Sequence, residues 1–139
     1  MNATSSLLSR FRRWILAGLI LMWAAAFTTT HLPGPSLPKM HLSDKSLHAI
    51  GFFALSVTFL LTLRAYGVTR LRRDGLVLIV MPIYGAVDEL TQGLPFVGRT
   101  TDVRDWLFDI IGIAIALAVW EGIALLISRG CRKGRPASP

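Results

Sequence analysis

Four apolar blocks, separated by short polar connections, constrain the fold of this chain more than any other feature. The blocks cover residues 14–30, 47–63, 75–87 and 110–127 of the 139-residue sequence. A helix needs about 20 residues to cross the hydrocarbon core of a membrane, so the second, third and fourth blocks reach that length only if their helices continue into polar flanks. The sequence therefore predicts an all-α membrane protein, one domain over residues 1–139, with a basic tail at 128–139 and a bundle of four transmembrane helices at about 14–30, 45–63, 75–93 and 106–127.

Basic residues are distributed unevenly among the connections. Eleven of the 15 lysines and arginines lie before the first block, between the second and third blocks, or after the fourth. Cytoplasmic segments carry the excess of Lys and Arg in membrane proteins, which predicts cytoplasmic termini, a cytoplasmic connection at 64–74 that binds anionic lipid headgroups, and outward-facing connections at 31–43 and 93–105. The net charge of +7 thus reports orientation, and no nucleic-acid partner is expected because no basic surface with interleaved aromatic residues is present.

Two features of the first block and the connection after it have simple interpretations. An A-x-A sequence at 24–26 is typical of signal-peptide cleavage sites, but the length of the apolar run favours a span that is retained. The connection holds Pro33, Pro35 and Pro38, which exclude a regular helix. His31 and His41 lack ligand spacing, so we expect solvated loop histidines and not a zinc site.

Three groups of polar side chains fall at the predicted outer ends of the helices, and the first opens the second helix. Ser43 is expected to cap this helix. Asp44 and His48 are spaced i, i+4, and Lys45 and His48 are spaced i, i+3, so the three side chains share one helix face. Helix capping explains Asp44 and Lys45, but His48 already lies inside the apolar block.

The second group closes the third helix. The apolar block from Gly75 to Val87 has 13 residues, about 20 Å of helix, whereas the hydrocarbon core is about 30 Å thick. The helix is therefore expected to continue through Asp88, Glu89 and Gln92, which places both carboxylates below the outer membrane surface. The alternative is a helix that ends at Asp88 in a thinned membrane.

The third group opens the fourth helix, after a turn that carries Arg99. Thr101 is expected to cap the helix. The next three acidic residues recur at i, i+3 and i+7 and form one stripe: Asp102, Asp105 and Asp109. Asp102 can simply complement the helix dipole, but Asp109 lies two turns deeper.

Small residues continue the same three faces inward. Gly51 and Gly112 follow their polar groups at helical spacing, and Gly85 precedes its own, which predicts close helix contacts there. Glu121 lies about 120° around the helix from Asp109 and near the opposite membrane face. We expect it to be a structural residue paired with an arginine.

Short connections favour antiparallel neighbours, so the three polar faces are expected to meet in one outward-facing polar and acidic pocket. Such a cluster supports three functions: a structural network of ion pairs, a binding site, or a metal-assisted active site. Candidate catalytic residues are Glu89, Asp105 and His48, and candidate metal ligands are Asp102, Asp105 and Asp109. The expected binding residues are Asp44, Lys45, His48, Glu89, Gln92, Arg99, Asp102, Asp105 and Asp109.

Residues 40–118 resemble the VanZ-like family of small bacterial membrane proteins. Three motifs in this order carry the resemblance: Asp44-Lys45-x-x-His48, Glu89-x-x-Gln92, and Arg99-x-x-Asp102-x-x-Asp105 followed by Gly112. The family usually has asparagine where this chain has Asp109. The resemblance implies a four-span inner-membrane protein of the cell envelope, and some members are linked to low-level antibiotic resistance against lipid-tailed glycopeptides such as teicoplanin.

The sequence thus predicts a multi-pass protein of the bacterial inner membrane whose outer pocket recognises the head of a lipid or of a lipid-linked envelope molecule. A metal-assisted hydrolase or transferase on a lipid-linked phosphate is the first alternative, and a structural or accessory subunit is the second. Membrane lipids, a lipid-linked envelope precursor or a lipoglycopeptide are the expected partners. A divalent cation is the one cofactor that the residues suggest.

Overall fold

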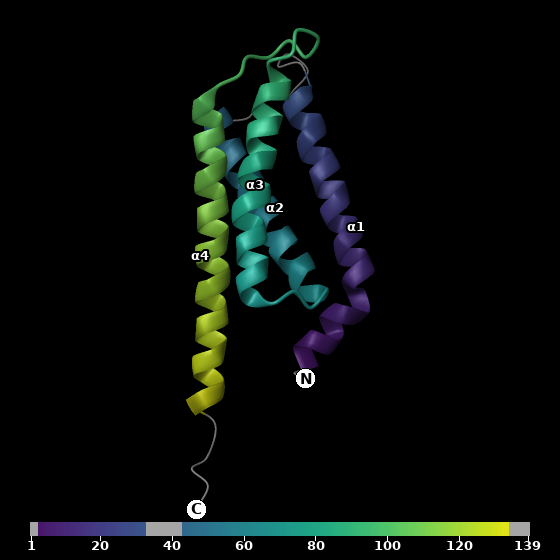
Figure 1. The fold of residues 1–139 in the computed structure, drawn as a ribbon, viewed down its shortest axis with the longest axis vertical. Coiled ribbons are helices and arrows are strands. Elements are labelled where there is room, and N and C mark those ends of the chain that lie inside the picture. Colours follow the sequence, from purple (N-terminus) through teal and green to yellow (C-terminus); the bar gives the residue numbers. More distant parts are fainter. Residues whose placement is uncertain (1–2, 33–42, 134–139) are drawn as a thin grey trace, which may run out of the picture.

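The computed structural model describes residues 3–32 and 43–133, and within them it is all-helical. The helices run alternately up and down, so α1 begins and α4 ends at the same end of the bundle (Figure 1). We call this the basic end and the opposite one the acidic end. The four helices are α1 (Ala3–His31), α2 (Asp44–Ala65), α3 (Arg70–Gln92) and α4 (Val103–Lys133).

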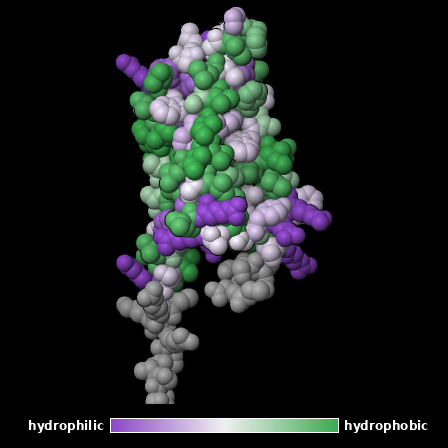
Figure 2. Space-filling model, in the orientation of Figure 1, coloured by the Kyte–Doolittle hydropathy of each residue, from purple (hydrophilic) through white to green (hydrophobic). Residues whose placement is uncertain are grey.

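Three of the described helices are long and apolar enough to cross a membrane, over Leu7–His31, Asp44–Ala65 and Val103–Gly130. This confirms the all-helical, membrane-compatible class. α3 carries charged residues at both of its ends, so its composition is less apolar. Large apolar side chains such as Leu21, Leu78 and Leu126 are exposed. Figure 2 shows a broad apolar surface along the bundle, with many hydrophilic residues gathered toward the basic end and others at the acidic end.

The connection between α2 and α3 is much shorter than expected. Residues 66–69 form it, and Gly67 has φ +77°, the left-handed conformation in which glycine commonly ends a helix. The expected connection at 64–74 is therefore wrong, because Arg70 already begins α3. Arginine is a good helix former, so hydropathy alone placed the start of the helix too late. α4 likewise continues to Lys133, past the expected end at 127.

The arginines of α3 hold α4 at the basic end. The Arg73 guanidinium donates to Glu121 Oε1 at 2.7 Å, and Arg70 also pairs with Glu121. Arg73 is 7% exposed and stacks over Trp120. The prediction that Glu121 pairs with an arginine is confirmed.

The core lies where α2, α3 and α4 meet, with α2 and α4 in the most extensive contact. Its buried apolar side chains are Phe52, Leu55, Leu60, Val77, Met81 and Ile113. Two of the three glycine predictions are confirmed. A Cβ on Gly112 would overlap the carbonyl oxygen of Ala49, and one on Gly85 would lie 2.9 Å from Asp109 Oδ2. The prediction for Gly51 is wrong, because open space surrounds it.

Candidate functional site

The polar faces of α2 and α4 meet at the acidic end, as predicted. Lys45 Nζ donates to Asp102 Oδ2 at 3.2 Å and to Asp105 Oδ1 at 3.1 Å. One turn deeper, His48 Nδ1 lies 2.9 Å from Asp109 Oδ1. The His48 and Asp109 side chains are 4% and 0% exposed, so this hydrogen bond is shielded from solvent.

Asp102, and not Thr101, caps α4. Asp102 immediately precedes the first helical residue, and its Oδ1 accepts the backbone N–H of Arg104 at 2.9 Å. This hydrogen bond, followed by the one from Lys45, holds the pKa of Asp102 below its usual value. The Thr101 hydroxyl instead donates to the carbonyl oxygen of Glu89. The expected Thr101 cap is wrong because the helix begins one residue later than the sequence suggested.

α3 supplies Glu89 and Gln92 from its last turn. It ends at Gln92, so the alternative of a helix that ends at Asp88 is wrong. Glu89 Oε2 accepts the backbone N–H of Asp102 at 3.0 Å, and Oε1 lies 3.9 Å from His48 Nε2. Gln92 donates to Glu89 at 3.4 Å and to Asp88 at 2.9 Å. The α3 face thus ties the start of α4 to the centre of the cluster.

Asp88, which the predicted list of binding residues omitted, is also a member of this cluster. It is 1% exposed, and its Oδ1 accepts the Thr30 hydroxyl at 3.0 Å. His31 Nδ1 lies 3.8 Å from the same carboxylate, and His31 Nε2 lies 2.9 Å from the Thr91 hydroxyl. In the sequence, the threonines at the end of the first apolar block were the only indication of the contact between Thr30 and Asp88.

His31 was expected in an irregular loop, but it is the last residue of α1 and stacks on Phe27 with ring centroids 3.9 Å apart. Its loop assignment is wrong because the helix continues to His31, two residues before the first proline of the connection. His41 and the three prolines lie outside the described residues.

Arg99 joins the ends of α1 and α2 from the connection between α3 and α4. Its Nη1 donates to the carbonyl oxygen of Thr30 at 2.9 Å, and its Nη2 lies 3.5 Å from Asp44 Oδ1. With this contact, all nine predicted binding residues lie in one cluster, which we call the acidic cluster. Its members, with Asp88 added, are Asp44, Lys45, His48, Asp88, Glu89, Gln92, Arg99, Asp102, Asp105 and Asp109.

Comparisons with family models, curated proteins and solved structures found no match. The resemblance to the VanZ-like family therefore stays a prediction.

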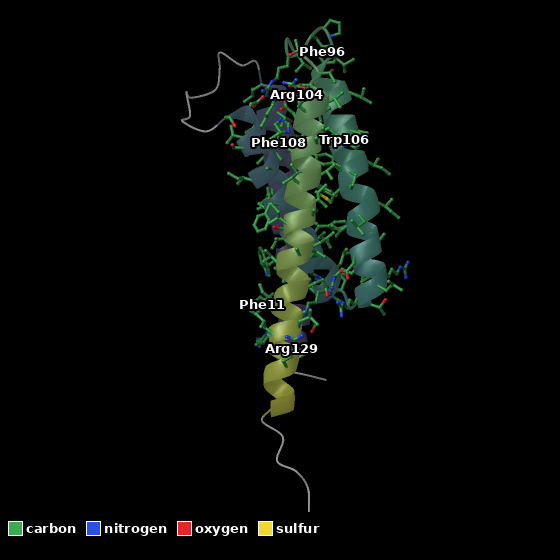
Figure 3. The ribbon with its side chains drawn as sticks, turned by 90° about the vertical axis from the view of Figure 1, so that its left-hand side faces the viewer. Phe11, Phe96, Arg104, Trp106, Phe108 and Arg129 are labelled. Atoms are coloured by element: carbon green, nitrogen blue, oxygen red, sulfur yellow. The ribbon has the colours of Figure 1, made fainter. Side chains whose placement is uncertain are left out.

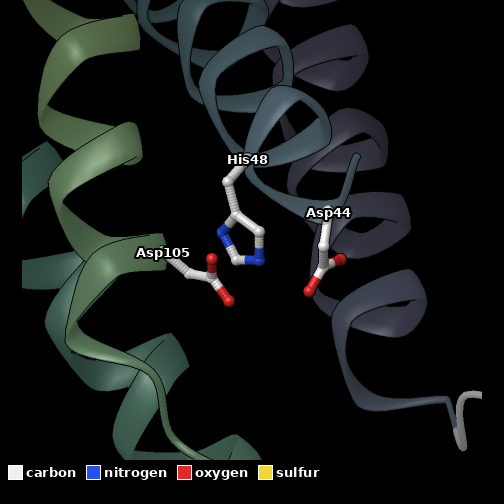
Figure 4. A group of neighbouring side chains, drawn as sticks. All are labelled: Asp44, His48 and Asp105. Carbon is white, nitrogen blue, oxygen red and sulfur yellow. The ribbon is translucent and has the colours of Figure 1, made fainter. Parts of the chain in front are cut away.

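One subset of the acidic cluster has the geometry of a metal site. Asp44, His48 and Asp105 each offer a ligand atom, and the three atoms lie within 4.8 Å of one another. Figure 4 shows the imidazole between the two carboxylates. This group shares only Asp105 with the ligand set expected from the sequence, because Asp102 pairs with Lys45 and Asp109 pairs with His48.

An apolar hollow of about 560 Å³ lies between α1 and α3. Its volume falls within the range of about 300–1,000 Å³ that is typical of small-molecule sites. The lining residues are Trp23, Ala24, Phe27, Val80, Ile83, Tyr84 and Val87. Two of the lining residues lie next to residues of the acidic end: Phe27 stacks on His31, and Val87 precedes Asp88 in the chain.

Proposed function

We propose that this protein is a multi-pass protein of the bacterial inner membrane that recognises the polar head of a lipid or lipid-linked envelope molecule. In this proposal all four helices span the membrane, both termini are cytoplasmic, and the acidic cluster faces outward. One observation carries it: a buried cluster of charged side chains adjoins an apolar hollow at the same end of the bundle.

The neighbouring hollow and cluster favour a ligand with two chemically different parts. The hollow is lined by apolar side chains of α1 and α3 and suits an acyl or isoprenoid chain. His31 lies between the hollow and the cluster, because its ring stacks on Phe27 of the hollow and its Nδ1 lies 3.8 Å from Asp88 of the cluster. A lipid tail in the hollow would therefore hold its attached head beside the cluster.

The cluster contains groups that bind the usual headgroup chemistry. Lys45 and Arg99 are cations that can hold a phosphate, and Arg99 can do so with two parallel N–H donors. Carboxylates beside them can accept hydrogen bonds from amines or hydroxyls. The Lys45 and Asp102 side chains are 33% and 41% exposed, so a headgroup can reach this pair without opening the buried centre.

Lipid-linked envelope precursors and lipid-tailed glycopeptides such as teicoplanin both combine an apolar chain with a polar head. They are the partner classes that we propose beside ordinary phospholipids. A metal-assisted hydrolase or transferase that acts on such a molecule is the second candidate, favoured by the Asp44, His48 and Asp105 group.

Native mass spectrometry of protein purified in a mild detergent tests the proposal. Wild-type protein should retain one lipid class above its share in the membrane. A Lys45→Gln and Arg99→Gln double variant should lose at least 90% of this enrichment, whereas Arg129→Gln should keep it. Arg129 is a matched control because it is an exposed cation of α4 at the opposite end (Figure 3).

Thermal unfolding of the same samples separates recognition from a structural role. Lys45 and Arg99 are partly exposed, at 33% and 17%, and surface ion pairs contribute only about 0–1 kcal/mol, so recognition predicts a loss of lipid that is much larger than the change in stability. Unchanged lipid retention in the double variant would refute recognition. A collapse of stability in parallel with lipid loss would instead favour a structural network of ion pairs.

A further inference from the structure

The acidic cluster contains more negative than positive side chains. Within the described residues of this end, six carboxylates face three cations. Uncompensated carboxylates beside the hydrocarbon region are costly, which favours a bound cation. The carboxylates belong to Asp44, Asp88, Glu89, Asp102, Asp105 and Asp109, and the cations to Lys45, Arg99 and Arg104.

His48 has the hydrogen-bond arrangement of a metal ligand. Its residue is 6% exposed, and its Nδ1 is 2.9 Å from Asp109 Oδ1. Metal-binding histidines commonly donate one ring N–H to a carboxylate, which orients the ring and leaves the other nitrogen for the metal. In the described part of the chain, His48 Nε2 makes no hydrogen bond. Its ion-pair contact is with Glu89 Oε1, at 3.9 Å.

The two carboxylates beside His48 also keep an oxygen available. Asp105 uses Oδ1 for Lys45 at 3.1 Å, and Asp44 uses Oδ1 for Arg99 at 3.5 Å. Among the described residues, neither Oδ2 atom takes part in a hydrogen bond or ion pair. Each of the three side chains thus has its shortest polar contact through one atom, and its second atom makes no hydrogen bond within the described residues.

We propose that Asp44, His48 and Asp105 bind one divalent transition-metal ion, Zn²⁺ or Mn²⁺, with Asp109 as the residue that orients His48. One imidazole nitrogen with two carboxylate oxygens suits these ions better than Ca²⁺ or Mg²⁺, which prefer oxygen ligands alone. Three protein ligands leave a coordination position open, as in catalytic zinc sites.

The spacing of the ligand atoms is close to that of a formed site. Zn–N and Zn–O bonds of about 2.0–2.2 Å place two ligands at most about 4.4 Å apart, and the three atoms lie within 4.8 Å of one another. The Asp44 side chain is 54% exposed, so it can turn inward without disturbing the helices. The metal would lie beside Lys45 and Arg99, which pair with the Oδ1 atoms of Asp105 and Asp44.

Titration of the full chain with the metal alone tests the site. After chelator treatment in detergent, isothermal titration with Zn²⁺ and with Mn²⁺ should give one equivalent per chain for at least one ion. His48→Gln should weaken this binding by at least 100-fold. Asp109→Asn should weaken it about 10–100-fold, the usual effect of removing the partner of a metal-bound histidine.

Two further variants keep the test decisive. His31→Gln, at a histidine of the same end, should bind metal as the wild type does. Asp44→Asn changes an exposed residue and should weaken binding at least 10-fold even where His48→Gln does not fold. Absence of a one-to-one complex, or equal binding by wild type and Asp44→Asn, would overturn the proposal. Because no lipid is added, its failure is independent of lipid retention.

Discussion

Gly112 offers a way to open the acidic cluster without changing a polar side chain. A Cβ at this position would overlap the carbonyl oxygen of Ala49 and lie 3.0 Å from the backbone nitrogen of Phe53. Ordinary contacts are about 3.5–4.0 Å long, so Gly112→Ala should force α4 away from α2 by at least about 0.5–1 Å, the shift that the Phe53 contact alone requires. Backbone atoms form the obstacle, and rotation of a side chain cannot relieve it.

This displacement has a calculable effect on the cluster above it. The His48–Asp109 hydrogen bond of 2.9 Å would lengthen to at least about 3.4–3.9 Å, beyond the usual range of about 2.7–3.2 Å. Overpacking typically costs about 1–3 kcal/mol. We therefore expect Gly112→Ala to lower the free energy of unfolding by at least this amount.

Denaturant unfolding in detergent micelles, followed by helicity, measures the change. Gly122→Ala is the matched control, because it lies in the same helix with no atom within 4 Å of its added Cβ. It should be neutral or more stable by up to about 1 kcal/mol, since alanine favours a helix. Asp109→Asn should also cost less in the Gly112→Ala background than in the wild type. Equal stability of the two glycine variants would refute the close contact.

Two further predictions concern orientation and the basic end. In a Cys131→Ser background, Thr100→Cys should react with a membrane-impermeant thiol reagent in intact cells, whereas Thr69→Cys should react only after permeabilisation; the reverse pattern would contradict the proposed topology. Glu121→Ala should lower the free energy of unfolding by about 1.5–3 kcal/mol, because it removes one of the two carboxylates that pair with the 7% exposed Arg73 and leaves only Asp74. An Arg73→Met and Glu121→Leu double variant should recover most of this loss, and a double variant as unstable as Glu121→Ala would contradict the buried pair.

Spacing within one helix was sufficient to predict much of the site. Asp44, Lys45 and His48 share a face because of helical periodicity, and the same is true of Asp102, Asp105 and Asp109. The alternating charges then placed both faces at the same end. The structure confirms that these faces meet, through Lys45 and His48.

Contacts between helices required the structure. Spacing does not define how one helix is rotated against another, so it did not show that Asp109 binds His48 while Asp44 joins His48 and Asp105. Asp88 was left out of the predicted binding residues for the same reason, because its partner Thr30 lies 58 residues away in the chain. Helix ends were misplaced where charged residues continue a helix, as at Arg70.

The central claim is that a lipid tail occupies the hollow while its head contacts the acidic cluster. Val87 lines the hollow and is 49% exposed, and Val119, at 44% exposed, lies on α4 away from it. These two valines are a matched pair of sites for a photo-crosslinking amino acid.

Crosslinking in living cells, with the captured lipids identified by mass spectrometry, is the most direct measurement. The Val87 site should capture one lipid class well above its share of the membrane, and Arg99→Gln should remove this enrichment. The Val119 site should capture lipids in proportion to their abundance. The same bulk lipid profile at both sites would contradict the account.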